Sequence, residues 1–316
     1  MLPLKVVNPR PLDQGPVFWA GWGVRNQPSR TAEVVCLFRA MDQRRPQAQR
    51  VLDDPWARHF LSPVFRAALG TIEATGPVGR WVEAHSPGLV AYILTRHRYI
   101  DDLLVAALNR GVEQVVILGA GYDTRAYRLS AALGGRPVWE LDFPATSARK
   151  TEILGRLGKD LPRAKVEHLQ VDFRHEQVEE VLSRAHFLFG RPTFFIWEGV
   201  SMYLTREAVK STLRMLHSLG GPGSELAMDF WFLLDSPDLM AATHRLTPNL
   251  LHLLGEPITF GIHPDDVTYF LGRLGYRAEE VMTPARLEAR YLNNERTVYP
   301  ADYVVHSVWD RPYGAE

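Results

Sequence analysis

Short continuous apolar runs alternate with amphipathic helical stretches through the middle of the chain. Such runs, bounded by glycine or polar residues, are typical of strands that are buried on both faces of a parallel sheet. Strands that alternate with helices indicate parallel crossover connections. The runs cover residues 112–119, 137–142, 165–172, 192–199 and 224–231. This pattern predicts an α/β fold with a doubly wound sheet.

The first part of the chain favours helices instead. In residues 30–43 the apolar side chains share one stripe of a helix. Residues 86–111 carry a longer helical pattern, with Ser86 as a candidate N-cap and Gly111 as a candidate C-cap. A shorter helix is predicted between them, over residues 56–65. We therefore expect an N-terminal helical cap ahead of the sheet.

The pattern changes again after residue 232. Residues 233–262 are rich in leucine and predict an inserted helical lid, while 277–283 and 303–310 predict two closing strands, one of them antiparallel. The sheet would then have seven strands, most of them parallel. We expect a single catalytic domain over residues 1–316, composed of the cap (1–111), a cofactor-binding core (112–232), the lid (233–262) and a C-terminal part that completes the sheet (263–316).

Composition and charge narrow the class of protein. The 316 residues include 36 Lys and Arg against 36 Asp and Glu, so the chain lacks the overall basic field of a nucleic-acid-binding protein. With 46% hydrophobic and 23% charged residues, the composition excludes a disordered or collagen-like chain. The single cysteine, Cys36, excludes an internal disulfide. Without an apolar signal segment or a run of about 20 apolar residues, we expect a cytoplasmic protein with no membrane partner.

A strand, a glycine turn and a helix are predicted for the segment LGAGYDTRAYRL. Gly119 and Gly121 would let a ligand approach the backbone closely, but the third glycine of the dinucleotide fingerprint is replaced by Thr124. Asp142 follows Gly121 by 21 residues and ends the next strand, the spacing at which a carboxylate meets ribose hydroxyls. A purely structural turn and an N-cap role for Asp142 remain alternatives. The missing third glycine indicates a ligand that has a ribose but no pyrophosphate. S-Adenosylmethionine fits this description, because it combines an adenosine with a sulfonium and an amino-acid tail.

Seven motifs follow one another between residues 29 and 205. They are SRTAEVVCLFRAMDQ, DDPWARHF, RHRYIDDLL, LGAGYDTRAYRL, ELDFPATSARK, VDFR and IWEGVSMYLT. Their order resembles the leucine carboxyl methyltransferase-like family, in the bacterial branch that includes carboxyl O-methyltransferases of secondary metabolism. The resemblance implies a class I, Rossmann-like methyltransferase fold, with S-adenosylmethionine as cofactor and S-adenosylhomocysteine as product.

The resemblance also implies roles for basic residues on two helices. Arg96 would hold the carboxylate of the cofactor, since a guanidinium pairs with a carboxylate through two hydrogen bonds. Arg98 is the second choice, because it lies on a different helical face. Arg39 would be a further basic contact from the first helix. The alternative for each of these arginines is a place on a solvated helix face.

Acidic and aromatic residues at the strand ends would hold the rest of the cofactor. The resemblance places Asp172 beside the adenine amino group, Phe173 on the adenine ring and Glu198 near the ammonium group. Glu198 interrupts an apolar run, so its carboxylate needs a partner, and a bound ammonium would supply one. The alternative is a carboxylate that caps the next helix. The predicted cofactor-binding set is Arg39, Arg96, Arg98, Gly119, Ala120, Gly121, Asp142, Phe143, Asp172, Phe173 and Glu198.

The predicted reaction is an in-line displacement at a sulfonium methyl group. We find no strong candidate for a general base in the motifs, which favours an acceptor that is ionised already, such as a carboxylic acid. Tyr203 and Arg174 are candidates for placing the acceptor carboxylate. The substrate would be a bulky, partly apolar small-molecule or peptide acid, and no acidic or histidine cluster has the spacing of a metal site.

Three other functions stay open at this point. A phenol or hydroxyl could be methylated on the same fold, with help from a base. The chain could also bind the cofactor without catalysis, as a scaffold. A nicotinamide oxidoreductase is a third alternative, although Thr124 argues against it.

Overall fold

The computed structural model describes residues 27–71, 83–84, 86–173, 175–231 and 258–309. Most of the predicted lid, residues 233–257, lies outside the described residues, as does Arg174. The structure therefore tests the predicted sheet and the helices that flank it.

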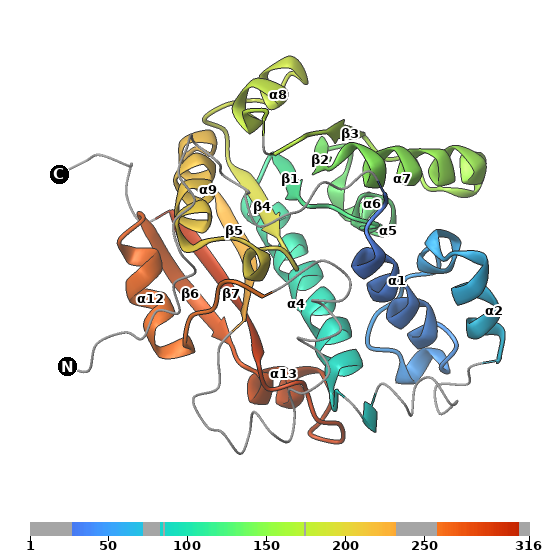
Figure 1. Ribbon diagram of the computed structural model, residues 1–316. Coiled ribbons are helices and arrows are strands. Elements are labelled where there is room, and N and C mark those ends of the chain that lie inside the picture. Colours follow the sequence, from blue (N-terminus) through green and yellow to red (C-terminus); the bar gives the residue numbers. More distant parts are fainter. Residues whose placement is uncertain (1–26, 72–82, 85, 174, 232–257, 310–316) are drawn as a thin grey trace.

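The described residues form a seven-stranded sheet in the order β3-β2-β1-β4-β5-β7-β6 (Figure 1). β7 runs antiparallel to both β5 and β6, and the pairs among β1 to β5 are parallel. The predicted seven-stranded, mostly parallel sheet is thus confirmed. The strands are β1 (Gln114–Leu118), β2 (Val138–Asp142), β3 (Val166–Gln170), β4 (Thr193–Trp197), β5 (Glu225–Trp231), β6 (Tyr276–Met282) and β7 (Asp302–Trp309).

Burial explains why the sequence pattern located these strands. Every residue of β1, β2, β4 and β5 is buried, as a strand covered on both faces requires. The edge strands β3 and β6 contain exposed or half-buried positions. Charged side chains such as Glu167 and Arg277 stand at these edges, where they discourage pairing with another chain.

Helical elements precede the sheet, with bounds that differ in part from the prediction. Ser29 caps α1 (Arg30–Asp42) by accepting a hydrogen bond from Ala32 N at 3.2 Å. The single helix predicted over 56–65 is wrong, because a 3₁₀ turn, η2 (Ala57–Phe60), is followed by a separate α2 (Pro63–Thr71). Another 3₁₀ turn, η1 (Gln47–Gln49), follows α1.

The long helix α4 (Leu89–Arg110) begins later than predicted. Its N-cap is Gly88 rather than Ser86, and Gly88 has a φ of +78°. A Cβ at Gly88 would lie 2.6 Å from the backbone nitrogen of Tyr299, so close packing against a distant segment requires glycine here. Gly111 ends the helix with a φ of +105°, as predicted for the C-cap.

Helices cover both faces of the sheet. Lys150 of α7 (Pro144–Leu157) pairs with Glu140 of β2, whereas the neighbouring Trp139 donates to Ala185 O at 3.0 Å, directly after α8 (Val178–Arg184). Successive strand residues point to opposite faces, so α7 and α8 lie on opposite sides of the sheet. α4 packs against β4, β5 and β7. The remaining elements are α5 (Arg125–Arg128), α6 (Ser130–Leu133), η3 (Gly158–Asp160), η4 (Ser201–Tyr203), α9 (Arg206–Leu219), α12 (Pro264–Gly272) and α13 (Pro284–Tyr291).

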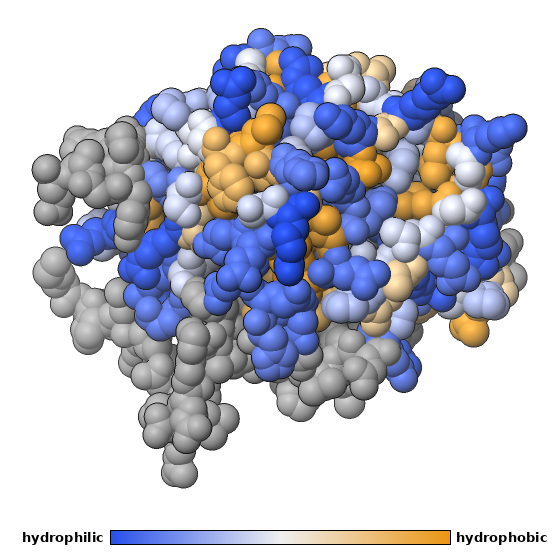
Figure 2. All heavy atoms as spheres, turned by 90° about the horizontal axis from the view of Figure 1, so that it is seen from above, coloured by the Kyte–Doolittle hydropathy of each residue, from blue (hydrophilic) through white to orange (hydrophobic). Residues whose placement is uncertain are grey.

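The surface of the described part is mainly hydrophilic on the face shown in Figure 2, where hydrophobic residues form small separate areas. Within the described segments, no helix has the length and apolar character needed to cross a membrane. Cys36 is a buried free thiol.

Candidate functional site

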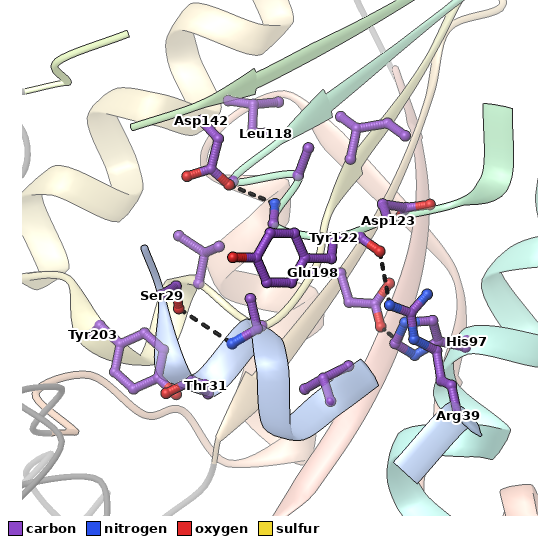
Figure 3. Close-up of a pocket in the computed structure, with 18 residues that line it drawn as sticks. Ser29, Thr31, Arg39, His97, Leu118, Tyr122, Asp123, Asp142, Glu198 and Tyr203 are labelled. Atoms are coloured by element: carbon purple, nitrogen blue, oxygen red, sulfur yellow. Dashed lines mark hydrogen bonds and ion pairs between the residues drawn. The ribbon is translucent and has the colours of Figure 1, made fainter. Parts of the chain in front are cut away.

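A pocket opens at the carboxyl ends of β1, β2 and β4, where ligands bind in open parallel sheets. The N-terminal helix α1 crosses one side of it (Figure 3). The backbone N–H of Ser29, just before α1, donates to Thr146 of α7 at 3.1 Å and so fixes the start of α1 beside the pocket. The lining residues are Ser29, Thr31, Ala32, Val35, Arg39, His97, Ile117, Leu118, Gly119, Ala120, Gly121, Tyr122, Asp123, Asp142, Glu198, Gly199, Val200 and Tyr203.

The glycine turn after β1 forms the floor of the pocket. Gly119 and Gly121 have φ values of +63° and +49°, which favour glycine. A Cβ at Gly119 would lie 2.6 Å from the Val200 side chain, and one at Gly121 would lie 3.2 Å from Ala32 Cβ. The bare backbone leaves room that a side chain would fill, which suits a ligand held close to the main chain.

Asp142 ties the end of β2 to this turn. Gly121 N–H donates to Asp142 Oδ2, and Phe143 N–H donates to Asp142 Oδ1 at 2.7 Å. The residue that caps α7 is Phe143, without a side-chain hydrogen bond, so the alternative N-cap role for Asp142 is wrong. The carboxylate instead lines the pocket beside the turn, as the 21-residue spacing predicts.

Arg125 is the centre of a buried set of ion pairs beneath the pocket. Its guanidinium lies 2.7 Å from Asp101 and 2.8 Å from Glu198, and it also pairs with Asp123. Arg96 extends the set by pairing with Glu198 at 2.7 Å and with Asp229 at 2.6 Å. These ion pairs join residues of α4, α5 and the strand ends.

Arg128 continues the same set toward α1. It pairs with Asp101 at 2.7 Å and lies 3.8 Å from Asp54, which in turn pairs with Arg39 at 2.8 Å. We call the connected set the buried ion network. Its members are Arg39, Arg96, Arg125, Arg128, His97, Asp54, Asp101, Asp123, Glu198 and Asp229.

The network shifts the ionisation of its members. Burial alone would raise the pKa of Glu198, but Arg125, His97 and Arg96 hold it well below its usual range. Burial raises the pKa of Asp229 despite the nearby Arg96. Burial lowers the pKa of His97, against the attraction of Glu198. Glu198 is therefore a carboxylate at neutral pH, and His97 is a neutral imidazole.

Two sequence arguments need correction here. The argument that Glu198 lacks a partner is wrong, because Arg96, Arg125 and His97 all contact it. The prediction for Arg96 also changes, because its guanidinium already pairs with two carboxylates of the protein, Glu198 and Asp229. It lies under the pocket, where its Nη2 would be 3.6 Å from a Cβ placed on the lining residue Gly199.

The other two candidate arginines lie in different environments. Arg39 lines the pocket, with Nη1 on Asp54 and Nη2 donating to Tyr122 O at 2.7 Å, while its buried Nε has no partner among the described residues. The structure does not bring Arg98 into the site. Its side chain is 48% exposed and pairs with Asp102 on the surface of α4.

The residues predicted for the adenine end lie beyond Asp142. Phe173 is buried and packs edge to face against Phe143, with ring centroids 5.4 Å apart. Asp172 is half-buried, and its backbone N–H donates to Glu176 at 2.9 Å. Phe143, Asp172 and Phe173 are not part of the pocket lining, whereas Ala120 and Tyr203 are.

The pocket includes residues that the sequence did not single out. The polar ones are Ser29, Thr31, His97, Tyr122 and Asp123. All of them lie inside the quoted motifs, and Asp123 directly follows the glycine turn. Their position within conspicuous motifs was the available signal. Thr31 Oγ1 is buried without a hydrogen-bond partner among the described residues, as is Arg39 Nε, so the lining has polar capacity left for a ligand. The described segments contain no group of three His, Cys, Asp or Glu side chains that could hold a metal ion.

A sheet of this order with one antiparallel strand, a glycine turn after β1 and a carboxylate at the end of β2 together define the class I methyltransferase fold. Residues 32–217 match the family model for leucine carboxyl methyltransferase. The chain therefore belongs to the leucine carboxyl methyltransferase family, as its motifs predict.

Individual relatives agree with this membership. A "Putative S-adenosyl-L-methionine-dependent methyltransferase" of Mycobacterium sp. (strain JLS) is 31% identical over 290 residues, which cover 84% of this chain and 90% of the relative. A relative of the same description from Parafrankia sp. is 35% identical over 206 residues, covering 63% of this chain and 62% of its own length. The cofactor in these names is the one predicted from the sequence.

Solved structures confirm the fold. A DUF574 family protein from Streptomyces avermitilis has a TM-score of 0.59 at 12% identity, covering 89% of this chain and 97% of its own. A protein of Thermobifida fusca titled as a "putative methyltransferase" has a TM-score of 0.57 at 15% identity, covering 91% of this chain and 97% of its own. Similarity at this level of identity supports the architecture of the sheet and its helices.

Proposed function

We propose that the chain transfers a methyl group from S-adenosylmethionine to the carboxylate of a small-molecule or peptide acid. Asp142 would accept hydrogen bonds from the ribose hydroxyls, and the turn of Gly119, Ala120 and Gly121 would lie under the cofactor. Arg39 would receive the carboxylate of the methionine tail, with Arg96 and Glu198 supporting this end from below. The adenine would extend past Asp142 toward Phe143, Asp172 and Phe173, which lie outside the pocket lining.

The observation that carries the carboxylate acceptor is the distribution of groups around the pocket. Figure 3 shows Asp142 at one end, Arg39 and His97 at another, and Tyr203 with Ser29 and Thr31 on a third side. This third side presents hydroxyl groups, which can hold a carboxylate but are weak bases. An acceptor that enters here needs to be ionised before it binds.

The main task of the protein in this reaction would be to align the acceptor with the methyl group of the cofactor. The cofactor supplies a methyl group on a sulfonium, which is already a good leaving group. A carboxylic acid has a pKa near 4 and is ionised at neutral pH, so no proton has to be removed. Tyr203, buried and on the lining, would hold one carboxylate oxygen in line, and the surrounding wall would exclude water.

A hydroxyl acceptor is the second candidate. It would require a general base, and His97 is the histidine on the described lining. His97 lies at the Arg39 end rather than on the Tyr203 side, which favours the carboxylate.

The bond that forms distinguishes the two acceptors. The protein is given S-adenosylmethionine with a labelled methyl group and a panel of aromatic acids, fatty acids, N-acyl amino acids and matched phenols. The label is expected to appear in products that release volatile methanol in mild alkali. Methyl esters hydrolyse under these conditions, whereas methyl ethers do not. The rate is also expected to stay flat above pH 6, because the acceptor is ionised throughout. An alkali-stable product, or a rate that rises with pH toward the phenol range, would replace the carboxylate by a hydroxyl.

Replacement of Tyr203 by Phe tests the proposed contact with the acceptor. The variant Tyr203→Phe is expected to lower kcat/KM roughly tenfold, since one hydrogen bond to a charged group is lost. Its affinity for S-adenosylhomocysteine should equal that of the wild type, because the ring remains in place. Turnover at the wild-type rate would remove Tyr203 from the mechanism.

A further inference from the structure

Asp302 is a buried acid outside the pocket lining. It is the first residue of β7 and is 2% exposed. Its side chain makes no hydrogen bond or ion pair with the described residues, and Oδ1 is fully buried. A charged carboxylate that leaves water without a partner costs far more free energy than the neutral acid does. The burial of Asp302 therefore favours the protonated form.

A second acid lies on the same face of the sheet. In the antiparallel pair of β5 and β7, Asp302 is opposite Trp231, and Asp229 comes two residues before Trp231. Opposite residues, and residues two apart, share one face, so Asp229 and Asp302 are diagonal neighbours, roughly 7–8 Å apart. Two carboxylates at this distance repel each other in a buried site.

The nearby cation is used by other acids. Arg96 of α4 donates to Asp229 Oδ2 at 2.6 Å and to Glu198 Oε1 at 2.7 Å. Asp229 also accepts the backbone N–H of Gly199 at 2.7 Å. Asp229 is thus held by two donors and Asp302 by none of the described residues, so a single proton shared by the two acids belongs on Asp302.

The other surroundings of Asp302 supply no further charge. Among the described residues, the titratable and charged groups that face it are Asp229 from β5, and Arg96 and Tyr92 from α4. Burial keeps the phenol of Tyr92 neutral by raising its pKa well above the usual value. The pairing of β6 with β7 ends at the uncharged Met282. Burial and the Asp229 carboxylate raise the pKa of Asp302 well above its usual range, against the effect of Arg96.

We propose that Asp302 is a proton-binding site that makes the pocket sensitive to pH: the chain binds one proton there when it folds, and release of this proton weakens the hold of Arg96 on Glu198. Ionised Asp302 would be a third carboxylate facing Arg96. Glu198 lines the pocket, so alkaline pH would disturb that end of the pocket from behind. This inference goes beyond methyl transfer and is independent of the acceptor.

The pH dependence of unfolding tests the buried proton. Above about pH 4 an aspartate in the unfolded chain is ionised, whereas Asp302 in the folded protein keeps its proton. The wild type must therefore take up a proton to fold, and the variant Asp302→Asn need not. From about pH 5 until the folded protein releases the proton, the folding equilibrium constant of the wild type is expected to fall relative to Asp302→Asn by close to tenfold per pH unit. Urea unfolding at a series of pH values measures this difference.

Two further variants show whether the effect belongs to the buried acid. Asp302→Ala removes the acid without adding an NH₂ group, and it should gain on the wild type with rising pH as Asp302→Asn does. The surface variant Asp102→Asn should follow the wild type, because the carboxylate it replaces is 47% exposed. A difference from the wild type that is constant with pH in both Asp302 variants would overturn the buried proton.

Infrared spectroscopy reads the proton directly in the folded wild type. The carbonyl band of a protonated carboxyl group is expected at pH 6 and should be missing from Asp302→Asn. Absence of this band from the wild type would also overturn the buried proton, without reliance on any variant.

Binding of S-adenosylhomocysteine tests the link between Asp302 and the pocket. The pH at which the unfolding difference levels off marks release of the proton from the folded protein. Above this pH, the affinity of the wild type is expected to fall roughly fivefold or more relative to Asp302→Asn, the range of coupling between two distinct sites. Calorimetry on both proteins gives the ratio of their Kd values, in which the titration of the ligand itself cancels. A ratio that stays constant through the pH of proton release would overturn the link to the pocket.

Discussion

The substitution Arg125→Met is expected to lower the free energy of unfolding by about 3–5 kcal/mol relative to the wild type. Arg125 is 1% exposed and holds Asp101, Asp123 and Glu198 together. Methionine has a similar volume but no charge, so three buried carboxylates would each lose a cationic partner. For a chain of this length the loss corresponds to a decrease in Tm of roughly 5–15 °C. Thermal unfolding followed by circular dichroism measures it.

Arg98→Met is the matched control for this variant. Arg98 is 48% exposed and makes a surface pair with Asp102 one helical turn away, an arrangement that contributes about 0.5 kcal/mol or less. Both variants replace arginine by methionine, so the difference between their Tm values measures the effect of losing buried rather than exposed ion pairs. Similar melting temperatures for the two variants would show that the buried ion network does not hold the ends of α4, α5 and β4 together.

Asp142→Asn is expected to weaken S-adenosylhomocysteine binding by roughly tenfold to a hundredfold. The carboxylate has two oxygens, and each already accepts one backbone N–H, from Gly121 and Phe143. Asparagine offers one acceptor oxygen, which would be used by the backbone, and its NH₂ group would face the ribose hydroxyls with the wrong polarity. Calorimetric titration with S-adenosylhomocysteine gives the change in affinity.

The surface variant Asp102→Asn controls for the change of charge. Asp102 is 47% exposed in its pair with Arg98, on a helix face outside the pocket. The Asp102→Asn variant should therefore bind S-adenosylhomocysteine as tightly as the wild type does. An Asp142→Asn protein that binds as tightly as the wild type would move the ribose to another place in the pocket.

The strands could be predicted from sequence because they are buried on both faces. A continuous apolar run indicates a strand that is covered on both faces, so β1, β2, β4 and β5 were located within one or two residues. Gly119, Gly121 and Asp142 were found for a similar reason, since their spacing follows from one strand–helix–strand unit. The start of α4 was mispredicted because Gly88 packs against the backbone near Tyr299, a contact 211 residues away in the chain.

The environment of Glu198 could not be predicted in the same way. Its partners Arg96, His97 and Arg125 come from segments about 70 to 100 residues earlier in the chain, and arginines are frequent throughout the sequence. Local periodicity does not show which of them meet. His97 was overlooked because one histidine on a helix carries no visible partner until the helix is placed beside the end of β4.

The composition of the buried ion network has a consequence for turnover. Its four arginines face five carboxylates, and burial together with the nearby Glu198 carboxylate raises the pKa of Asp229 despite Arg96. S-Adenosylmethionine has a net charge of +1, and S-adenosylhomocysteine has none. Before transfer, the charges of the buried ion network and of the cofactor sum to zero. Loss of the methyl group removes the positive charge above a region that is poorly screened by salt. The reaction thereby weakens the hold on its own product, and the ratio of the two dissociation constants measures by how much.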